Sequence, residues 1–401
     1  MPVMSPDVVR TQGLQALERR DYALAKSCFE RLTLWDAGAN GNVAVTSSDW
    51  VHLALACRGL KDDAAEEAAL FQALSVDSHD LMALLMRGHL FERQGRPHDA
   101  ARAYQAVAMI APPVDQVVPH LRQGLVHALR STERYAKEHA EFVERCLAEE
   151  SMRFGSAELD RFRLSLDILW GRKARHEARP LGYFVPALAP VEFFDRQLFP
   201  WLEAVEAATP LIRQEFLQVL ESETGFAPYV QQDSDQPLAQ WAELNHSPRW
   251  SAFHLLKEGL PVPGNAQRCP RTLDALSHAP QPVQEGRTPV ALFSLLKPKT
   301  RIPPHHGISN ARLLTHLPLI VPPACRFRVG NSVREWVPGQ AWVFDDTIEH
   351  EAWNDSDQLR VILIFDVWHP ALTEPEKTMI SALARAQEAF MGPSAFNYSA
   401  G

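Results

Sequence analysis

Two histidines in the last quarter of the chain have the residue type and the setting of metal ligands. His305 lies in Pro303-Pro304-His305-His306-Gly307, and His350 follows Asp345-Asp346-Thr347-Ile348-Glu349. Both lie at strand boundaries, outside the runs predicted as strands, and four short predicted strands in the 45 residues between them can return the second histidine to the first. Two imidazoles directed at one point suit iron, zinc, copper or nickel. Surface or strand-capping histidines give the same pattern, so both interpretations remain open.

Arg360 is a third residue that could take part in this chemistry. It stands ten residues after His350 and opens the apolar predicted strand Val361–Trp368. A buried positive charge is costly unless an anion pairs with it, and a guanidinium binds a carboxylate through two parallel hydrogen bonds. The position predicts either an anionic ligand or a structural salt bridge.

Short strands after residue 290 would position these side chains. They are rich in Val, Ile, Leu, Phe and Trp, with turns predicted at Gly330-Asn331-Ser332 and Pro338-Gly339. Antiparallel strands at this spacing are typical of a jelly roll or barrel. The predicted strands are Val290–Leu296, Arg312–Val321, Cys325–Val329, Val333–Val337, Ala341–Phe344 and Val361–Trp368.

The first 150 residues contain an internal repeat. They hold only 6 of the 30 prolines and have helical periodicity. Leu70 and Ala73 map to Tyr104 and Val107, each 34 residues later, and an earlier segment from Tyr22 is offset by 41 because of a loop over Gly38–Ser48. The pattern resembles tetratricopeptide repeats, about three copies with a capping helix near 120–150. Such units stack into a solenoid with a groove, which is either a peptide-docking surface or a scaffold.

Composition limits the other possibilities. The 40 basic and 49 acidic residues give a net charge of −9, which argues against broad contact with nucleic acid or anionic membranes. Five widely spaced cysteines with no C-x-x-C pair argue against a disulfide framework and a cysteine zinc site. No apolar run is long enough to span a membrane, and MPVMSPDVVR does not have the pattern of a signal peptide, so a cytoplasmic protein is expected.

Five motifs near the end of the chain occur in the order of a known enzyme family. They are Pro304-His305-x-Gly307-x-Ser309-Asn310-x-Arg312-Leu313, His316-Leu317-x-Leu319-Ile320-x-Pro322, Trp336-x-x-Gly339, Val343-Phe344-Asp345-Asp346-x-x-Glu349-His350-Glu351-x-Trp353 and Arg360-x-x-x-Ile364-x-Asp366-Val367-Trp368-His369-Pro370. This run resembles the aspartyl/asparaginyl β-hydroxylases, which are iron(II)- and 2-oxoglutarate-dependent oxygenases on a double-stranded β-helix. Tetratricopeptide-like repeats also precede this domain in the family.

The resemblance implies an α+β multidomain chain. The expected parts are a tetratricopeptide-like helical solenoid over residues 1–150, a helical linker over 151–190, and a double-stranded β-helix (jelly-roll) oxygenase domain with flanking helices over 191–401.

The resemblance also implies how the metal is held. His305 and His350 would bind iron(II), whereas His306 would face outward. Gly307 stands where most such oxygenases carry a carboxylate, so water would take the third protein position. Asp346 would hold that water, or would form an Asx turn in its loop.

Further residues are implied for 2-oxoglutarate. Arg360 and Ser294 would bind its far carboxylate, and His316 would lie near the carboxylate that chelates the metal. Leu314 stands where some family members carry an arginine, and Arg312 on the same strand face could substitute for it.

The implied activity uses iron(II), 2-oxoglutarate and O2 to hydroxylate a C–H bond, the β-carbon of Asp or Asn residues in a peptide or protein that the repeats could dock. A catalytically inactive repeat-containing adaptor is the alternative from another class, and Gly307 and Leu314 are its best support. A cupin-like zinc or manganese enzyme without 2-oxoglutarate is a third possibility, in which Arg360 would have no anionic partner.

Overall fold

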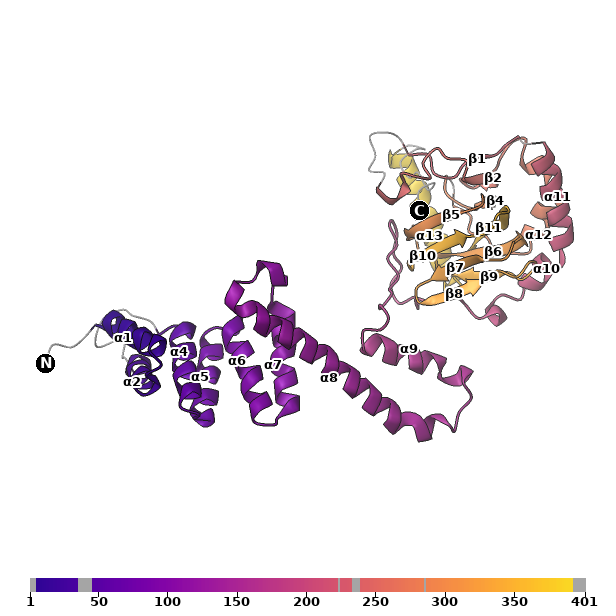
Figure 1. The fold of residues 1–401 in the computed structure, drawn as a ribbon. Coiled ribbons are helices and arrows are strands. Elements are labelled where there is room, and N and C mark those ends of the chain that lie inside the picture. Colours follow the sequence, from indigo (N-terminus) through magenta and orange to yellow (C-terminus); the bar gives the residue numbers. More distant parts are fainter. Residues whose placement is uncertain (1–4, 35–44, 223, 233–238, 285, 392–401) are drawn as a thin grey trace. The chain divides into compact units, whose positions relative to one another are not determined.

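The computed structural model describes residues 5–34, 45–222, 224–232, 239–284 and 286–391. The chain divides into two compact units, Met1–Trp170 and Gly171–Gly401, and each is described by itself (Figure 1). Within those ranges, none of the helices combines the length and the apolar character that crossing a membrane requires.

The first unit consists of antiparallel helix pairs followed by a long helix (Figure 1). Helix α1 packs against α2, α4 against α5 and α6 against α7, and α8 closes the last pair. This order agrees with the predicted helical repeats and the capping helix. The bounds are α1 (Pro6–Glu18), α2 (Tyr22–Thr33), α4 (Ser47–Gly59), α5 (Asp63–Val76), α6 (Leu81–Arg93), α7 (Pro97–Ile110), α8 (Pro119–Ser151) and α9 (Asp160–Leu169).

Small residues allow paired helices to approach closely. A β-carbon at Gly88 of α6 would overlap the ring of Tyr104 of α7, so the glycine makes room for the aromatic side chain. The repeat equivalents Leu70 and Ala73, and Val107 beside Tyr104, are also buried. The repeated positions are therefore the interhelical core of this unit.

The prediction of a loop over Gly38–Ser48 is wrong at its C-terminal end. Its positions 38–44 lie outside the described residues, but Ser47 and Ser48 already belong to α4. The Thr46 side chain accepts a hydrogen bond from the backbone of Asp49, whose side chain accepts one from the backbone of Thr46. This capping box starts the helix earlier than the loop prediction allows.

The second unit contains two antiparallel sheets. One has the order β1-β2-β4-β11-β6-β9 with β3 beside β2, and the other has the order β5-β10-β7-β8. The strands are β1 (Ala227–Pro228), β2 (Trp250–Lys257), β3 (Leu260–Pro261), β4 (Ala291–Leu296), β5 (Thr300–His305), β6 (Arg312–Ile320), β7 (Cys325–Val329), β8 (Ser332–Glu335), β9 (Trp342–Phe344), β10 (His350–Asn354) and β11 (Arg360–Trp368).

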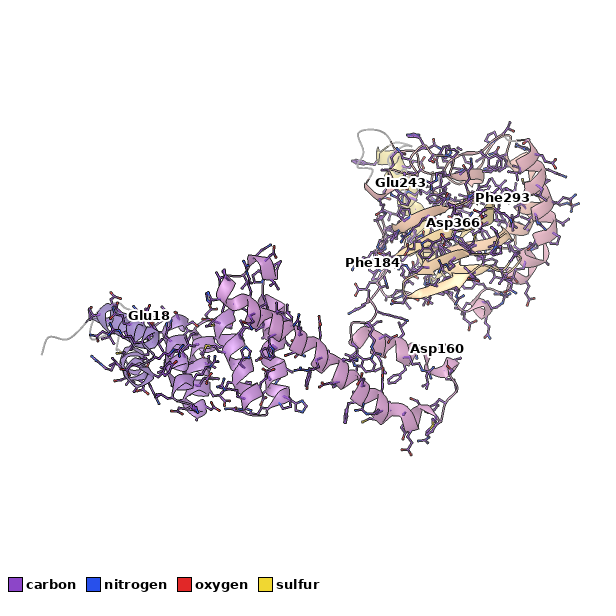
Figure 2. The ribbon with its side chains drawn as sticks, in the orientation of Figure 1. Glu18, Asp160, Phe184, Glu243, Phe293 and Asp366 are labelled. Carbon is purple, nitrogen blue, oxygen red and sulfur yellow. The ribbon has the colours of Figure 1, made fainter. Side chains whose placement is uncertain are left out.

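Helices cover one face of the seven-stranded sheet (Figure 1). Phe293 of β4 lies on this face (Figure 2), where its ring centroid is 5.1 Å from that of Phe216. Glu215 of α11 ties two of the helices together, because its carboxylate accepts hydrogen bonds from the backbone N–H groups of Arg271 and Thr272 at the start of α12. The helices of this layer are α10 (Leu202–Ala207), α11 (Thr209–Glu221) and α12 (Pro270–Leu276). Helix α13 (Glu374–Met391) follows the last strand and packs in a separate cluster through Ile380.

The opposite face of the same sheet meets the four-stranded sheet. One buried cluster contains Leu296 and Ile362 from the first sheet together with Phe327 and Ala352 from the second. Residues alternate between the two faces along each strand, so every second residue of β4, β6 and β11 is directed toward the space between the sheets.

All six predicted strands are present, and five further strands were not predicted. Two of the five carry the histidines, namely β5 and β10. Strand β5 contains Pro303 and Pro304, which lower the expectation of a strand. The two antiparallel sheets agree with the coarser part of the predicted fold.

Candidate functional site

The two histidines lie opposite each other on neighbouring strands. His305 is the last residue of β5 and His350 the first of β10, and the antiparallel register pairs them directly. Both are buried, and their ring centroids are 4.0 Å apart. The fold thus brings together two side chains that are 45 residues apart in the sequence.

Backbone carbonyls fix the orientation of both imidazoles. The Nδ1 atom of His305 lies 2.8 Å from the carbonyl oxygen of Pro303, and that of His350 lies 3.0 Å from the carbonyl oxygen of Ile348. Because a carbonyl oxygen only accepts, Nδ1 carries the proton in each ring and Nε2 keeps its lone pair. Burial lowers the pKa of His305 to about 4 and the pKa of His350 well below its usual value. Both rings are therefore neutral and able to ligate a metal.

His306 differs from its neighbour in position and contacts. It is half-buried, and its Nδ1 lies 2.9 Å from the carbonyl oxygen of Thr347. Unlike His305, it does not line the pocket that the two sheets enclose.

Asp346 occupies the space beside Gly307. The backbone N–H of Gly307 donates to the carbonyl of Asp346 at 2.6 Å, and a β-carbon on Gly307 would overlap the Asp346 carboxylate. Oδ2 of that carboxylate lies 3.3 Å from an Nη atom of Arg312, whereas the buried Oδ1 has no hydrogen-bond partner among the described residues. Burial raises the pKa of Asp346 to about 7.

The Asx turn in this loop is made by the preceding residue. Oδ1 of Asp345 accepts hydrogen bonds from the backbone N–H and the hydroxyl of Thr347, at 2.9 and 2.6 Å. The Asp346 carboxylate, which lines the pocket, is not used in that turn.

Arg360 is a buried cation that lines the same pocket. Its side chain is almost fully buried, and one Nη atom lies 3.4 Å from the hydroxyl of Ser294, which also accepts from the indole N–H of Trp250 at 3.1 Å. No carboxylate of the described residues pairs with it, and its Nε has no hydrogen-bond partner there. Burial lowers the pKa of Arg360 to about 9. A guanidinium in this state fits an anionic ligand.

Strand β6 supplies three residues on the inner face. Arg312, Leu314 and His316 alternate along it and line the pocket. The His316 ring lies between Phe327 and Phe344, at centroid distances of 4.9 and 4.7 Å. Burial lowers its pKa well below the usual value, and its Nδ1 has no partner among the described residues.

The pocket unites the residues that the sequence singled out. It encloses about 890 Å³ of atom-free space, part of it open to solvent, and residues from both sheets line it. All seven predicted site residues are among them, namely Ser294, His305, Arg312, His316, Asp346, His350 and Arg360.

Other residues of the site were not predicted. Trp250 and Tyr229 stack on each other at a centroid distance of 3.9 Å and line the pocket, and no local pattern marks either of them. Asp366, near the centre of the sheets in Figure 2, has a buried carboxylate whose Oδ1 accepts from the backbone of Val290. Burial raises its pKa to about 6. Asp366 belongs to one of the matched motifs, but it is not among the residues that line the pocket.

Comparison with known proteins agrees with the motifs. Residues 206–370 match the family model described as Aspartyl/Asparaginyl beta-hydroxylase. An ornithine lipid ester-linked acyl 2-hydroxylase of Rhizobium tropici is 35% identical over 180 residues, which is 44% of this chain and 60% of that protein. The aspartyl/asparaginyl beta-hydroxylase of Homo sapiens is 31% identical over 183 residues, 45% of this chain and 23% of that protein. The resemblance predicted from the sequence is confirmed for this segment, which spans less than two thirds of either relative.

Among solved structures, the Arabidopsis OM64 TPR domain aligns with 32% of this chain and 95% of that chain. The TM-score is 0.27 and the sequence identity is 15%.

Proposed function

We propose that the chain is an iron(II)- and 2-oxoglutarate-dependent dioxygenase that hydroxylates the β-carbon of Asp or Asn residues in a peptide or protein. One observation carries the proposal: two neutral histidines and a buried guanidinium without a carboxylate partner among the described residues line the same pocket. The hydroxylase relatives support the reaction class, and the two antiparallel sheets support a double-stranded β-helix.

His305 and His350 would hold the metal through Nε2, with both rings oriented by the carbonyls that accept from Nδ1. Oδ1 of Asp346 would hold a water molecule next to the metal, since it is buried and has no other partner among the described residues. When bound, iron(II) and 2-oxoglutarate supply the oxidising chemistry that converts C–H to C–OH.

The co-substrate would be bound at both of its ends. Arg360 and Ser294 would pair with the far carboxylate, which neutralises the buried guanidinium. His316 and Arg312 would lie near the carboxylate that chelates the metal. The aromatic side chains around His316 exclude water from this end of the pocket.

A second substrate class is supported by one residue. Leu314 places an aliphatic side chain in the pocket wall, where some members of the family carry an arginine. An aliphatic wall suits an acyl chain better than a carboxylate, and one relative is an acyl 2-hydroxylase by name. The helical repeats favour a peptide or protein substrate over an acyl chain, because such repeats could dock a peptide.

The test is anaerobic addition of iron(II) and 2-oxoglutarate to the full chain, with the metal-to-ligand charge-transfer absorbance recorded, followed by O2 and a succinate assay. We expect the absorbance band and succinate formation. His305→Ala and His350→Ala should each abolish both signals, and the matched control His306→Ala should keep them.

Three results would overturn the proposal in different ways. No band and no succinate would favour the inactive adaptor. Turnover with zinc or manganese in the absence of 2-oxoglutarate would favour a cupin-like enzyme. Loss of the signals in His306→Ala instead of His305→Ala would show that the ligand assignment is wrong by one residue.

A further inference from the structure

A second group of metal-ligating side chains lies in the helical unit, outside the segment that matches the hydroxylase family. His89 and Glu92 are on α6 and His127 is on α8. One ligand atom from each lies within 4.8 Å of those of the other two. Oε2 of Glu92 is 2.9 Å from Nε2 of His127 and 3.5 Å from Nδ1 of His89. One carboxylate oxygen therefore lies within reach of both imidazoles.

The helices fix this arrangement. His89 and Glu92 are three residues apart on α6, which places them on the same face. His127 faces them from the capping helix, and the two imidazoles stack with a centroid distance of 5.0 Å. The hydroxyl of Tyr104 on α7 donates to Oε2 of Glu92 at 2.9 Å. Ligating carboxylates in metal sites typically carry such a supporting hydrogen bond.

Two of the three groups, His89 and Glu92, are in the charge states that a metal requires. Burial and the neighbouring His127 lower the pKa of His89, so its ring is neutral. Burial alone would raise the pKa of Glu92, but hydrogen bonds from His127 and Tyr104 hold it below the usual value. A neutral imidazole and an ionised carboxylate are the forms that bind a cation.

The group is accessible. The side chains of His89, Glu92 and His127 are 37%, 30% and 44% exposed to solvent. Glu92 also lines a surface pocket between α7 and α8, together with Tyr104 and Ser131. An ion and its water ligand can therefore reach the group without opening the helices.

We propose that His89, Glu92 and His127 form a binding site for a divalent cation of the zinc type. Two imidazole nitrogens and one carboxylate oxygen are a donor set that zinc accepts in tetrahedral geometry, with water in the fourth position. Without metal, the Nε2–H of His127 donates to Glu92, and the ion takes the place of that proton. The bound ion links α6 to α8 and so secures the capping helix to the last repeat.

The experiment uses the full chain carrying His305→Ala and His350→Ala, so that the pocket of the second unit loses its histidines. Zinc is added after removal of metal with a chelator, and the bound zinc is measured by titration and by elemental analysis. We expect one zinc per chain, and a rise in the thermal unfolding temperature of the helical unit. Glu92→Gln and His127→Gln in this background should each weaken binding by about 10–100-fold or more, since loss of a ligand costs at least as much as loss of a group that supports one. His120→Gln, an exposed histidine on the same helix, is the matched control and should not change it.

X-ray absorption at the zinc edge gives a measurement that needs no further variant. Two imidazoles with only nitrogen and oxygen ligands, at about 2.0–2.1 Å, are expected. Sulfur ligands, no zinc bound to the background chain, or unchanged binding in folded Glu92→Gln and His127→Gln would each overturn the proposal. Circular dichroism in chelator establishes that the variants are folded.

Discussion

Gly307 and Asp346 are in direct contact, and a side chain at position 307 would occupy the volume that the Asp346 carboxylate fills. The two residues are also joined by a backbone hydrogen bond of 2.6 Å. The pocket wall therefore has a carboxylate beside Gly307, although this residue, two positions after His305, has no side chain of its own. The carboxylate comes from the loop before β10 and is held by Arg312.

Gly307→Ala should act by moving the Asp346 carboxylate. The added β-carbon has to displace that carboxylate from its contact with Arg312, so we expect iron(II) affinity and turnover to fall by about 10–100-fold, as for other groups that support metal ligands. Asp346→Ala should have a similar effect. The double variant should be no worse than the worse single variant, because both changes remove the same carboxylate. Iron titration and the succinate assay measure this, and additive losses would contradict it.

Arg360→Met should separate stability from co-substrate binding. Replacing a buried charge that has no carboxylate partner among the described residues with an apolar side chain should leave the ligand-free protein as stable as before, or more stable by about 1–3 kcal/mol. The dissociation constant of 2-oxoglutarate should rise by more than about 100-fold, because the buried charge pair is lost. Calorimetry with and without 2-oxoglutarate measures both. Arg326→Met, at an exposed arginine on β7, is the control. A clear loss of stability without ligand would contradict the anion-binding role.

His254 on β2 should make the second unit less stable in acid. Burial lowers the pKa of His254 to about 4, whereas an unfolded histidine titrates near 6.5. Between these values the unfolded chain binds more protons, so this stability is complete above about pH 6.5 and is lost as the pH falls toward 4. The contribution is on the order of 3 kcal/mol, because the two pKa values differ by about 2.5 units at 1.36 kcal/mol for each unit.

Urea unfolding at pH 7 and pH 4.5, followed by tryptophan fluorescence, measures this contribution. His254→Gln should reduce the difference in unfolding free energy between the two pH values, whereas His278→Gln, at an exposed histidine, should leave it unchanged. Equal acid sensitivity in His254→Gln and the wild type would show that this side chain is not the cause.

Glu215→Ala should destabilise the helical layer on the seven-stranded sheet. The carboxylate accepts hydrogen bonds from two backbone N–H groups and from the hydroxyl of Thr272, and its removal leaves these donors, two of them buried, without a partner. We expect a loss of about 3 kcal/mol in unfolding free energy. Glu221→Ala, at an exposed glutamate on the same helix, should change it by less than about 0.5 kcal/mol. Comparable losses in the two variants would contradict the capping role.

Local sequence pattern predicted the elements that follow a simple period. The helical repeat could be recognised because Leu70 and Tyr104 occupy the same position in consecutive units, and both are buried. Strand β11 could be recognised because five apolar residues, Val361–Phe365, follow Arg360 without interruption. His305 and His350 could be singled out because few other residue types ligate iron or zinc.

Contacts set by strand register could not be predicted from local pattern. Strand β2 brings Trp250 to Ser294, 44 residues away in the sequence, and only the pairing of β2 with β4 determines this contact. The adjacent Asp345 and Asp346 are identical in type, so the sequence does not tell which of them makes the Asx turn. The structure gives the turn to Asp345 and leaves the second carboxylate in the pocket.

The two proposed halves of the reaction centre are carried by different layers of the second unit. The histidines belong to the four-stranded sheet, whereas Arg360, Ser294 and His316 belong to the seven-stranded sheet. The thickness of the packing between the layers thus sets how far the metal would lie from the residues that anchor its chelating partner. Phe344 lies between the layers, and its ring contacts both His316 and His350. Replacing it with a smaller side chain should therefore shift the metal-binding histidines relative to the residues that bind 2-oxoglutarate, without removing any ligand.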